Sequence, residues 1–402
     1  DWADYFFKFV FLYRKLICCY LADNLEQAID SFEQSFQVRT REAMPVEWAA
    51  SMNDLAIVYR NRIRGDRAEN IEKAIASYTQ SLQVRTREAM PFDWALSMNN
   101  LANAYRFRIR GDCAENIEKA IGTYDQLLQV RTREAMPFDW ALSMVNLANA
   151  YSMRIRGDRA NNIEQAIAAY EQSLQVMTRK AMPIEWAASM NNLATAYSKR
   201  IKGDQANNIE QAIKIYQQSL QVRTREILPL DWAESMMNLA SAYMARIRGD
   251  RADNIEQAID AYHQSLQLMI RDAMPLDWAE SMMNLANAYN ERIRGDRADN
   301  IEQAIAAYQQ SLHVMTHETM PVKWATSMMN LASAYVERIR GDRAENIEQA
   351  IKAYKQSLQV RTREAMPVDW ATSMMNLAAA YYHRIREDRA KNLEQAIEAY
   401  EQ

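Results

Sequence analysis

Apolar residues recur at helical spacing along the whole chain, and their pattern repeats every 46 residues. In the segment 45–64 they lie three or four positions apart, which predicts one apolar stripe on a helix that opens at Pro45. This stripe consists of Trp48, Met52, Leu55, Ala56, Tyr59 and Ile63. We expect it to be the packing seam of the helix, with the tryptophan at the core between units.

A second helix is predicted after a short turn. Gly65 is expected to end the first helix, because glycine accepts the left-handed conformation found just past a helix C-terminus. Asn70 is expected to cap the second helix, which then runs to Met90. The apolar residues that this helix should bury are Ile71, Ala74, Ile75, Tyr78, Leu82 and Val84. No segment alternates with period two, so no strand is predicted.

Prolines and tryptophans show how regular the repeat is. All eight prolines lie 46 residues apart, from Pro45 to Pro367, and the nine tryptophans keep the same interval from Trp2 to Trp370. A fixed period of this length is typical of a solenoid, in which each unit buries its apolar face against its neighbours. We therefore predict one all-α solenoid over residues 1–402, with units that start near residues 1, 47, 93, 139, 185, 231, 277, 323 and 369.

The constant residues of the unit resemble a known family. The run Leu55-Ala56-x-x-Tyr59, followed by Ala74-x-x-x-Tyr78 and Pro91, resembles the tetratricopeptide signature. The segment 98–105, Met-Asn-Asn-Leu-Ala-Asn-Ala-Tyr, is similar to the longer units of kinesin light chains and to the arrays fused to bacterial CHAT caspase-like domains. The resemblance implies a right-handed superhelix of nine helical hairpins, the last incomplete, whose first helices line a concave binding groove. The unit departs from the family in being longer than the usual 34 residues.

One asparagine recurs in register on the predicted first helices. Asparagine is a mediocre helix former, so seven in register need a reason. Its amide both donates and accepts, which suits the N–H and C=O groups of an extended peptide; the resemblance also implies that such a ladder holds peptides. Alternatively, each amide bonds to a neighbouring helix and fixes the register of the units. The ladder asparagines are Asn100, Asn146, Asn192, Asn238, Asn284, Asn330 and Asn376.

Two neighbouring positions change along the chain. In the N-terminal half they are rich in amides, among them Asn99, Asn103 and Asn149. In the C-terminal half the residue before each ladder asparagine is a methionine, a side chain that adapts to varied apolar partners but also fills cores. If these methionines face the groove, the two halves grip different parts of a peptide. They are Met237, Met283, Met329 and Met375.

Charge and cysteine content narrow the class of protein. The formal net charge of −4 gives no reason to expect nucleic acid as a partner. Three cysteines cannot build a disulfide framework, so a reducing, cytoplasmic location is expected. The apolar stretch 5–21 is too short and too charged to be a membrane span.

Several motifs that carry chemistry elsewhere have a plainer explanation. Helix termination and a solvated turn explain the recurring Arg64-Gly65-Asp66, so we do not expect an adhesion motif. His313 and His317 lie four residues apart but lack further ligands, so no metal is expected. Cys18 has no consistently placed histidine partner, and no glycine-rich phosphate loop occurs. The chain is therefore expected to be non-enzymatic and to need no cofactor.

The first unit breaks the pattern. Residues 1–24 are predicted to form a divergent terminal helix whose aromatic residues either mediate self-association or are buried by a preceding segment. Because the chain starts without methionine and stops at Gln402 within a helix, we expect a piece of a longer array. The aromatic residues are Tyr5, Phe6, Phe7, Phe9 and Phe11.

These patterns favour a scaffold that binds a protein or an extended peptide along the concave face. One alternative is the sensor region of a larger bacterial CHAT caspase-like protease. A second alternative is a repeat protein that assembles with itself into a filament or oligomer.

Overall fold

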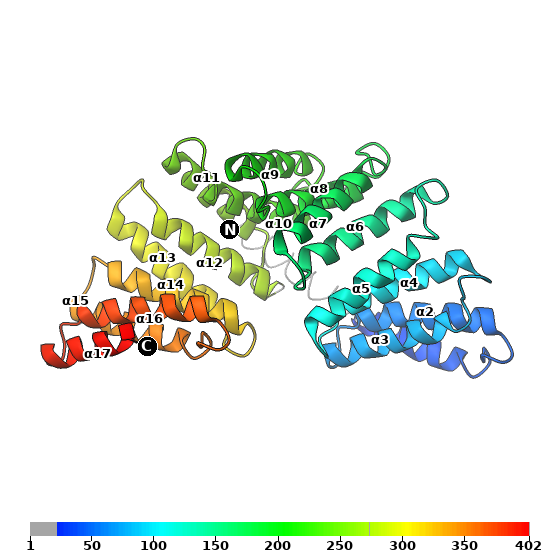
Figure 1. The fold of residues 1–402 in the computed structure, drawn as a ribbon, viewed down its shortest axis with the longest axis horizontal. Helices are drawn as coiled ribbons and strands as arrows, with labels where there is room; N and C mark the ends of the chain where they lie inside the picture. Colours follow the sequence, from blue (N-terminus) through cyan, green and yellow to red (C-terminus); the bar gives the residue numbers. More distant parts are fainter. Residues whose placement is uncertain (1–21, 273, 402) are drawn as a thin grey trace, which may run out of the picture. The chain divides into compact units, whose positions relative to one another are not determined.

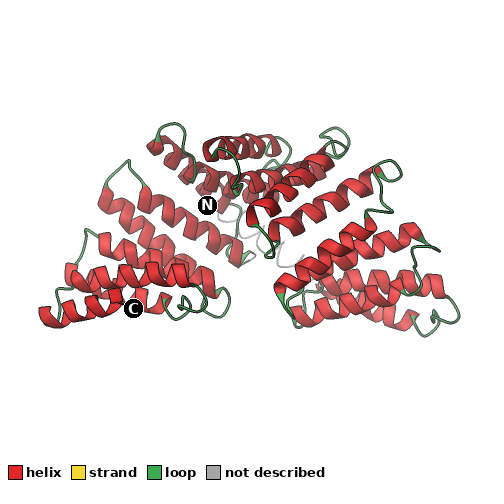
Figure 2. Cartoon of the chain, in the orientation of Figure 1, coloured by secondary structure: helices red, strands yellow, loops and turns green. Residues whose placement is uncertain are grey.

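The computed structural model describes residues 22–272 and 274–401, and these residues form helices joined by short turns, with no strand (Figures 1 and 2). Its contacts divide the chain into an N-terminal unit, Asp1–Val222, and a C-terminal unit, Arg223–Gln402. In the N-terminal unit, residues 22–35 are helical. They are followed by α2 (Pro45–Asn61), α3 (Arg67–Leu82), α4 (Pro91–Arg106), α5 (Cys113–Leu127), α6 (Pro137–Met153), α7 (Arg159–Leu174), α8 (Pro183–Ser198) and α9 (Gln205–Ser219).

The C-terminal unit continues the same alternation of first and second helices, and the all-α prediction is thus confirmed for the described residues. Its helices are α10 (Pro229–Met244), α11 (Arg251–Leu266), α12 (Pro275–Glu291), α13 (Arg297–Leu312), α14 (Pro321–Glu337), α15 (Arg343–Ser357), α16 (Pro367–Tyr382) and α17 (Arg389–Glu401).

Each first helix packs against the second helix of its own hairpin, and each second helix packs against the next first helix within its unit. The closest contacts use alanine: Ala49 and Ala56 of α2 and Ala74 of α3 have no exposed surface. Small side chains let two helix backbones approach, and the large Tyr78 fills the space beside them, itself fully buried. This combination of small residues and a buried tyrosine recurs in the hairpins from α2–α3 to α14–α15 and forms their core, whereas Tyr400 of α17 is exposed.

The turn inside each hairpin differs in detail from the sequence prediction. Gly65 has a φ of +81°, as its left-handed role requires, but α2 already ends at Asn61. The cap of α3 is Asp66, whose carboxylate accepts from the Glu69 N–H at 2.7 Å. Asn70, predicted as the cap, instead lies inside α3 and donates to the Arg64 carbonyl at 2.8 Å. The segment Arg64-Gly65-Asp66 is therefore a turn that hydrogen bonds to residues of α3 hold in place.

Ile63 is not part of the packing seam, and that prediction was wrong. It lies beyond the end of α2 and is 53% exposed, and its counterparts from Ile109 to Ile385 are exposed as well. The helical spacing of the stripe was extrapolated past Asn61, where the helix has already given way to the turn.

The second helix is also shorter than predicted, because α3 ends at Leu82 rather than at Met90. The intervening residues form a turn in which the Thr86 hydroxyl accepts from the Ala89 N–H at 3.2 Å. The Met90 N–H in turn donates to the Thr86 carbonyl at 2.9 Å. This turn delivers the chain to Pro91, the first residue of α4, where a missing N–H costs nothing.

The described tryptophans, from Trp48 to Trp370, are half-buried rather than enclosed in the core between units, in contrast to the prediction. In seven of these eight cases an arginine seven residues earlier lies over the ring, as Arg133 does over Trp140 at 5.8 Å from the ring centre. At Trp324 the corresponding residue is His317, which meets the ring edge-on at 5.3 Å. These tryptophans thus pack against the turn between two hairpins, and an arginine or histidine side chain of that turn covers each ring.

Two further predictions concern membrane spans and the N-terminal helix. None of the described helices combines the length and the apolar character needed to cross a bilayer. The predicted terminal helix 1–24, with its aromatic residues from Tyr5 to Phe11, lies almost wholly outside the described residues.

Candidate functional site

Within each unit, the first helices of successive hairpins contact one another. In the N-terminal unit α2 contacts α4, α4 contacts α6 and α6 contacts α8, whereas no two of α3, α5, α7 and α9 contact each other (Figure 1). A stack that touches along one side and diverges along the other curves toward the touching side. The first helices therefore line the inner side of each unit, and we call their surface the first-helix face.

The ladder asparagines hold neighbouring first helices together. The Asn146 amide donates to the Asn99 oxygen at 3.2 Å, and Asn100 donates to Asn53 at 3.5 Å. In other hairpins the acceptor lies one turn further along the helix: Asn192 donates to Asn149 at 3.2 Å, and Asn330 donates to Asn287 at 2.9 Å. At these four ladder positions one N–H of the amide thus fixes the register of two hairpins, as the alternative interpretation of the ladder expected.

This bond leaves part of each amide free. Asn146, Asn192 and Asn330 are half-buried, and a side-chain amide has a second N–H and a carbonyl oxygen besides the N–H already used. Asn100, by contrast, is only 9% exposed and is largely enclosed. The ladder therefore offers hydrogen-bonding groups on the first-helix face at some positions and not at others.

A buried tyrosine from the second helix orients the amide that accepts from the ladder. Tyr170 donates to the Asn149 oxygen at 2.6 Å, and Tyr308 donates to the Asn287 oxygen at 2.6 Å. Tyr124 makes the same bond to Asn103 at 2.9 Å, although the ladder residue Asn146 bonds to Asn99 instead. Burial raises the pKa of the Tyr170 hydroxyl to about 12, so that it keeps its proton and remains a donor. Asn103 is buried, while Asn149 and Asn99 are half-buried.

The methionines differ among themselves. Met283 is buried, and Met237 and Met329 are half-buried. The sulfur of Met329 lies 2.8 Å from a guanidinium nitrogen of Arg361, in the turn that leads to the next hairpin, and 3.6 Å from the hydroxyl of Ser373 in that hairpin. Met375 is 60% exposed. Met283 and Met329 thus contribute to packing between hairpins, which was the other reading of this row.

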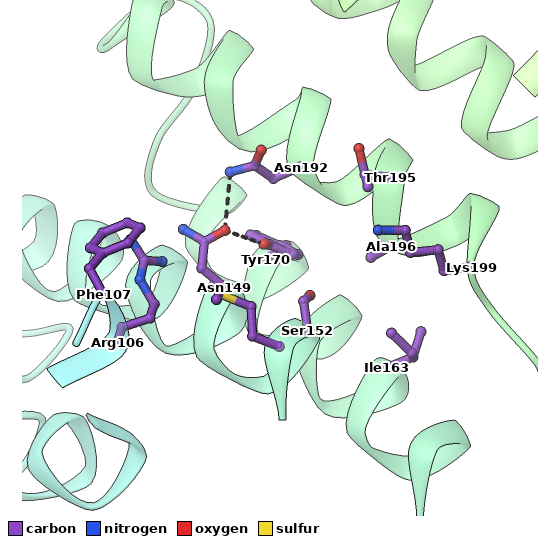
Figure 3. Close-up of a pocket in the computed structure, with 11 residues that line it drawn as sticks. Arg106, Phe107, Asn149, Ser152, Ile163, Tyr170, Asn192, Thr195, Ala196 and Lys199 are labelled. Atoms are coloured by element: carbon purple, nitrogen blue, oxygen red, sulfur yellow. Dashed lines mark hydrogen bonds between the residues drawn. The ribbon is translucent and has the colours of Figure 1, made fainter. Parts of the chain in front are cut away.

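A pocket of about 290 Å³ opens on the first-helix face of the N-terminal unit (Figure 3). In Figure 3 the Asn149 amide lies between Tyr170 and Asn192, with Arg106 and Phe107 on one side and Thr195, Ala196 and Lys199 on the other. Ser152, Met153 and Ile163 complete the lining. An adjoining pocket of about 360 Å³ shares Arg106 and Phe107 and is further lined by Arg60, Asn61, Arg67 and Asn103.

Arg106 is the most constrained charged group of these pockets. Its guanidinium carbon lies 4.5 Å from the centre of the Phe107 ring, and its buried Nε has no hydrogen-bond partner in the described residues. Burial lowers the pKa of this guanidinium; the hydroxyls of Tyr124 and Tyr170 oppose the shift, and the charge of Arg60 adds to it. An arginine stays charged at neutral pH even so. A charge held in this way favours a site for an anion.

Sequence reasoning placed the ladder on the first helices, where the structure has it, but did not identify the arginines. Arg60 and Arg106 occupy the same place in successive repeats, at the end of the first helix, where later hairpins have Ser152, Ser198 and Met244. The available signal was this restriction of the basic residues to the N-terminal hairpins.

Comparison with known proteins supports the repeat assignment. The family model described as tetratricopeptide repeat matches residues 48–85, 140–176, 186–225, 278–312, 324–362 and 370–402, more than half of the chain. No curated protein sequence matches the chain.

Among solved structures, the chain is similar to a signal transduction ATPase with numerous domains from Pyrococcus horikoshii, which has a tetratricopeptide repeat sensor. The TM-score is 0.52 at 13% identity, over 93% of this chain and 52% of the other. The Cut9–Hcn1 complex of the APC/C gives a TM-score of 0.49 at 16% identity, over 89% of this chain and 59% of the other. The chain thus spans between about half and three fifths of these proteins, and at such identities the likeness concerns the fold alone.

Proposed function

Because the chain belongs to the tetratricopeptide repeat family, we propose that it is a scaffold that binds an extended peptide, or an extended segment of a protein, on the first-helix face. The observation that carries this proposal is the row of half-exposed amides on successive first helices, beside open pockets in the N-terminal unit. A peptide backbone presents N–H and C=O groups in alternation, and amide side chains are able to pair with both.

The binding residues that we propose are the ladder asparagines with free amide groups and their neighbours. Asn146, Asn192 and Asn149 lie in the N-terminal unit, and Asn149 and Asn192 line its pocket of about 290 Å³. Apolar contacts at this pocket come from Phe107 and Met153. In the C-terminal unit the ladder continues from Asn238 to Asn376, beside Met237 and the exposed Met375. Asn100, Asn103 and Met283 are buried, and in this proposal they pack beneath the exposed residues of the first-helix face.

A selection from a random peptide library tests the proposal. The purified chain is immobilised and exposed to phage-displayed dodecapeptides, and convergent sequences should be enriched. Asn146→Ala combined with Asn192→Ala should weaken binding of the enriched peptides about tenfold, which corresponds to about 1.4 kcal/mol. The matched control is Gln126→Ala combined with Gln172→Ala, which removes two exposed amides from the second helices α5 and α7.

The control variant should bind as the unchanged chain does. Equal loss of affinity in both variants, or a selection that yields no convergent sequence, would contradict the proposal. Circular dichroism melting of both variants checks that the hairpins remain folded.

A second candidate function is the sensor region of a larger protein, such as one that carries a CHAT caspase-like domain. The observation that favours it is the similarity to the Pyrococcus horikoshii protein, of which the matched part of the fold is about half. Under this candidate the first-helix face would bind the signal, so both candidates use the same surface.

A further inference from the structure

Three basic residues lie at the C-terminal ends of the first helices in the N-terminal unit. Arg60 and Arg106 are in the last turns of α2 and α4, and Lys199 directly follows α8. We call them the inner-edge cations. Arg106 lines both adjoining pockets, Arg60 lines the pocket of about 360 Å³ and Lys199 lines the pocket of about 290 Å³. None of the three forms an ion pair with a described residue. Asp54, an acidic residue of α2, is not within ion-pair distance of any of them.

In the C-terminal unit, two arginines that cap the C-terminal ends of first helices form ion pairs with carboxylates. There Arg251 donates to the Met244 carbonyl and also pairs with Glu291 of the next hairpin. Arg297 makes the same two contacts, with the Asn290 carbonyl and with Glu337. Each of these two arginines thus caps the C-terminal end of one first helix and forms an ion pair with a glutamate at the end of the next first helix.

The N-terminal unit has two capping arginines, Arg67 and Arg159, but lacks the carboxylates that would pair with them. Arg67 donates to the Arg60 carbonyl, and Arg159 donates to the Ser152 carbonyl at 2.7 Å. The residues in the place of Glu291 and Glu337 are Phe107 and Lys199. Positive charge therefore accumulates at the C-terminal ends of these first helices, without carboxylates like those that pair with Arg251 and Arg297 in the C-terminal unit.

Arg106 makes this imbalance costly for the free protein. Among the described residues its buried Nε has no hydrogen-bond partner, and the charged side chain that acts on its pKa is another arginine, Arg60. An anion between the two would satisfy both guanidinium groups. A carboxylate suits them best, because its two oxygens match the planar fork of an arginine.

We propose that the inner-edge cations receive an acidic side chain, aspartate or glutamate, of a peptide bound on the first-helix face of the N-terminal unit. This inference rests on the proposed function and specifies the chemical class of its ligand. The amides of Asn149 and Asn192 and the apolar Phe107 and Met153 would contact the residues that flank the acidic one. The peptide is thus recognised by its negative charge at one place and by its backbone beside it.

The peptide selection is repeated with charge-neutral variants to test the inference. The probe is the same library of random dodecapeptides, fused at its C-terminus so that acidic side chains supply the displayed carboxylates. The test variant is Arg60→Gln combined with Arg106→Gln. The matched control, Arg110→Gln combined with Arg156→Gln, removes the same charge from exposed residues of the turns inside two hairpins. A further variant, Arg106→Lys, keeps the charge and covers the case in which the double variant fails to fold.

The unchanged chain, the control and Arg106→Lys should enrich peptides in which aspartate and glutamate are at least about threefold more frequent than in the starting library, a bias that Arg60→Gln with Arg106→Gln abolishes. Convergent peptides without an acidic bias would overturn this inference and leave the proposed function intact. A bias that survives in the double variant would overturn it in the same way. If no sequence converges with the unchanged chain, the proposed function fails and this inference fails with it.

Discussion

Arg108 and Glu72 form a two-pronged ion pair across successive hairpins. The guanidinium Nε donates to one carboxylate oxygen at 2.7 Å and Nη2 donates to the other at 2.8 Å. Arg108 follows the end of α4 and Glu72 lies on α3, in the preceding hairpin. The pair thus connects the turn of one hairpin to the second helix of the hairpin before it.

The same pair recurs throughout both units at a separation of 36 residues. Its two parallel hydrogen bonds fix direction as well as distance, so that each pair sets the angle between neighbouring hairpins. The recurring pairs are Arg62–Glu26, Arg154–Glu118, Arg200–Glu164, Arg292–Glu256, Arg338–Glu302 and Arg384–Glu348.

A double-mutant cycle on Arg108→Ala and Glu72→Ala should give a coupling energy of about 1 kcal/mol, reduced by solvent because both side chains are a quarter exposed. The measurement is urea unfolding of the four proteins followed by circular dichroism. Lys119–Glu115, an exposed pair on one helix, is the control and should show a smaller coupling. A larger coupling in the control would contradict the role assigned to the two-pronged pair.

The coupling between Arg108 and Glu72 should depend on pH. The hydrogen bond from Arg108 is the largest cause that lowers the pKa of Glu72 in the folded chain. A lowered folded pKa means stability that is complete above the unfolded glutamate value of about 4.3 and is lost as the pH falls through the folded pKa. The cycle measured at about pH 7 and again at about pH 3 should show this loss; a coupling that grows toward low pH would refute it.

Glycine to alanine substitution should have opposite effects at two sites. Gly122 lies within α5, where an added Cβ meets nothing within 4 Å, and Gly122→Ala should stabilise the chain by about 1 kcal/mol. Gly341 has a φ of +82°, and Gly341→Ala should destabilise it by about 1 kcal/mol through the backbone alone. Thermal unfolding of the two variants measures both shifts. Shifts of the same sign would show that backbone conformation is not the deciding term.

Arg131→Met should stabilise the N-terminal unit by about 1–2 kcal/mol. Arg131 is only 4% exposed, bonds to Ser143 at 3.0 Å and leaves its Nε without a partner, whereas the next repeat has the fully buried Met177 at this place. The readout is the midpoint of thermal unfolding. Arg133→Met, which removes the same charge from an exposed residue of the same turn, should bring no such gain, and Met177→Arg should lower the midpoint.

The sequence predicted the repeat, the helices and the left-handed glycine, because each depends on local spacing or on one backbone conformation. It misplaced the cap at Asn70 because asparagine and aspartate are both good cap residues, and the true cap, Asp66, lies only four residues earlier. It wrongly placed Ile63 in the packing seam because the periodic spacing of apolar residues does not show where the helix ends. These errors concern helix ends, where several residues compete for the same backbone groups.

The candidate site was only partly predictable for a different reason. The ladder was visible as a row, but its bonds to Asn99 and Asn149 depend on how neighbouring hairpins are offset. The importance of Arg106 depends on its surroundings in the folded chain, because its buried Nε has no hydrogen-bond partner among the described residues. The carboxylates that pair with the arginines capping first helices, Glu291 and Glu337, stand in other hairpins. A single repeat read alone contains no information on either point.

The most direct test of the account is to map where a selected peptide lies on the chain. A peptide from the library selection carries a benzophenone amino acid, is photo-crosslinked to the intact chain, and its attachment sites are located by mass spectrometry. We predict crosslinks on α4, α6 and α8, with Phe107 and Met153 among the modified residues. Crosslinks confined to the second helices α5, α7 and α9 would contradict binding on the first-helix face.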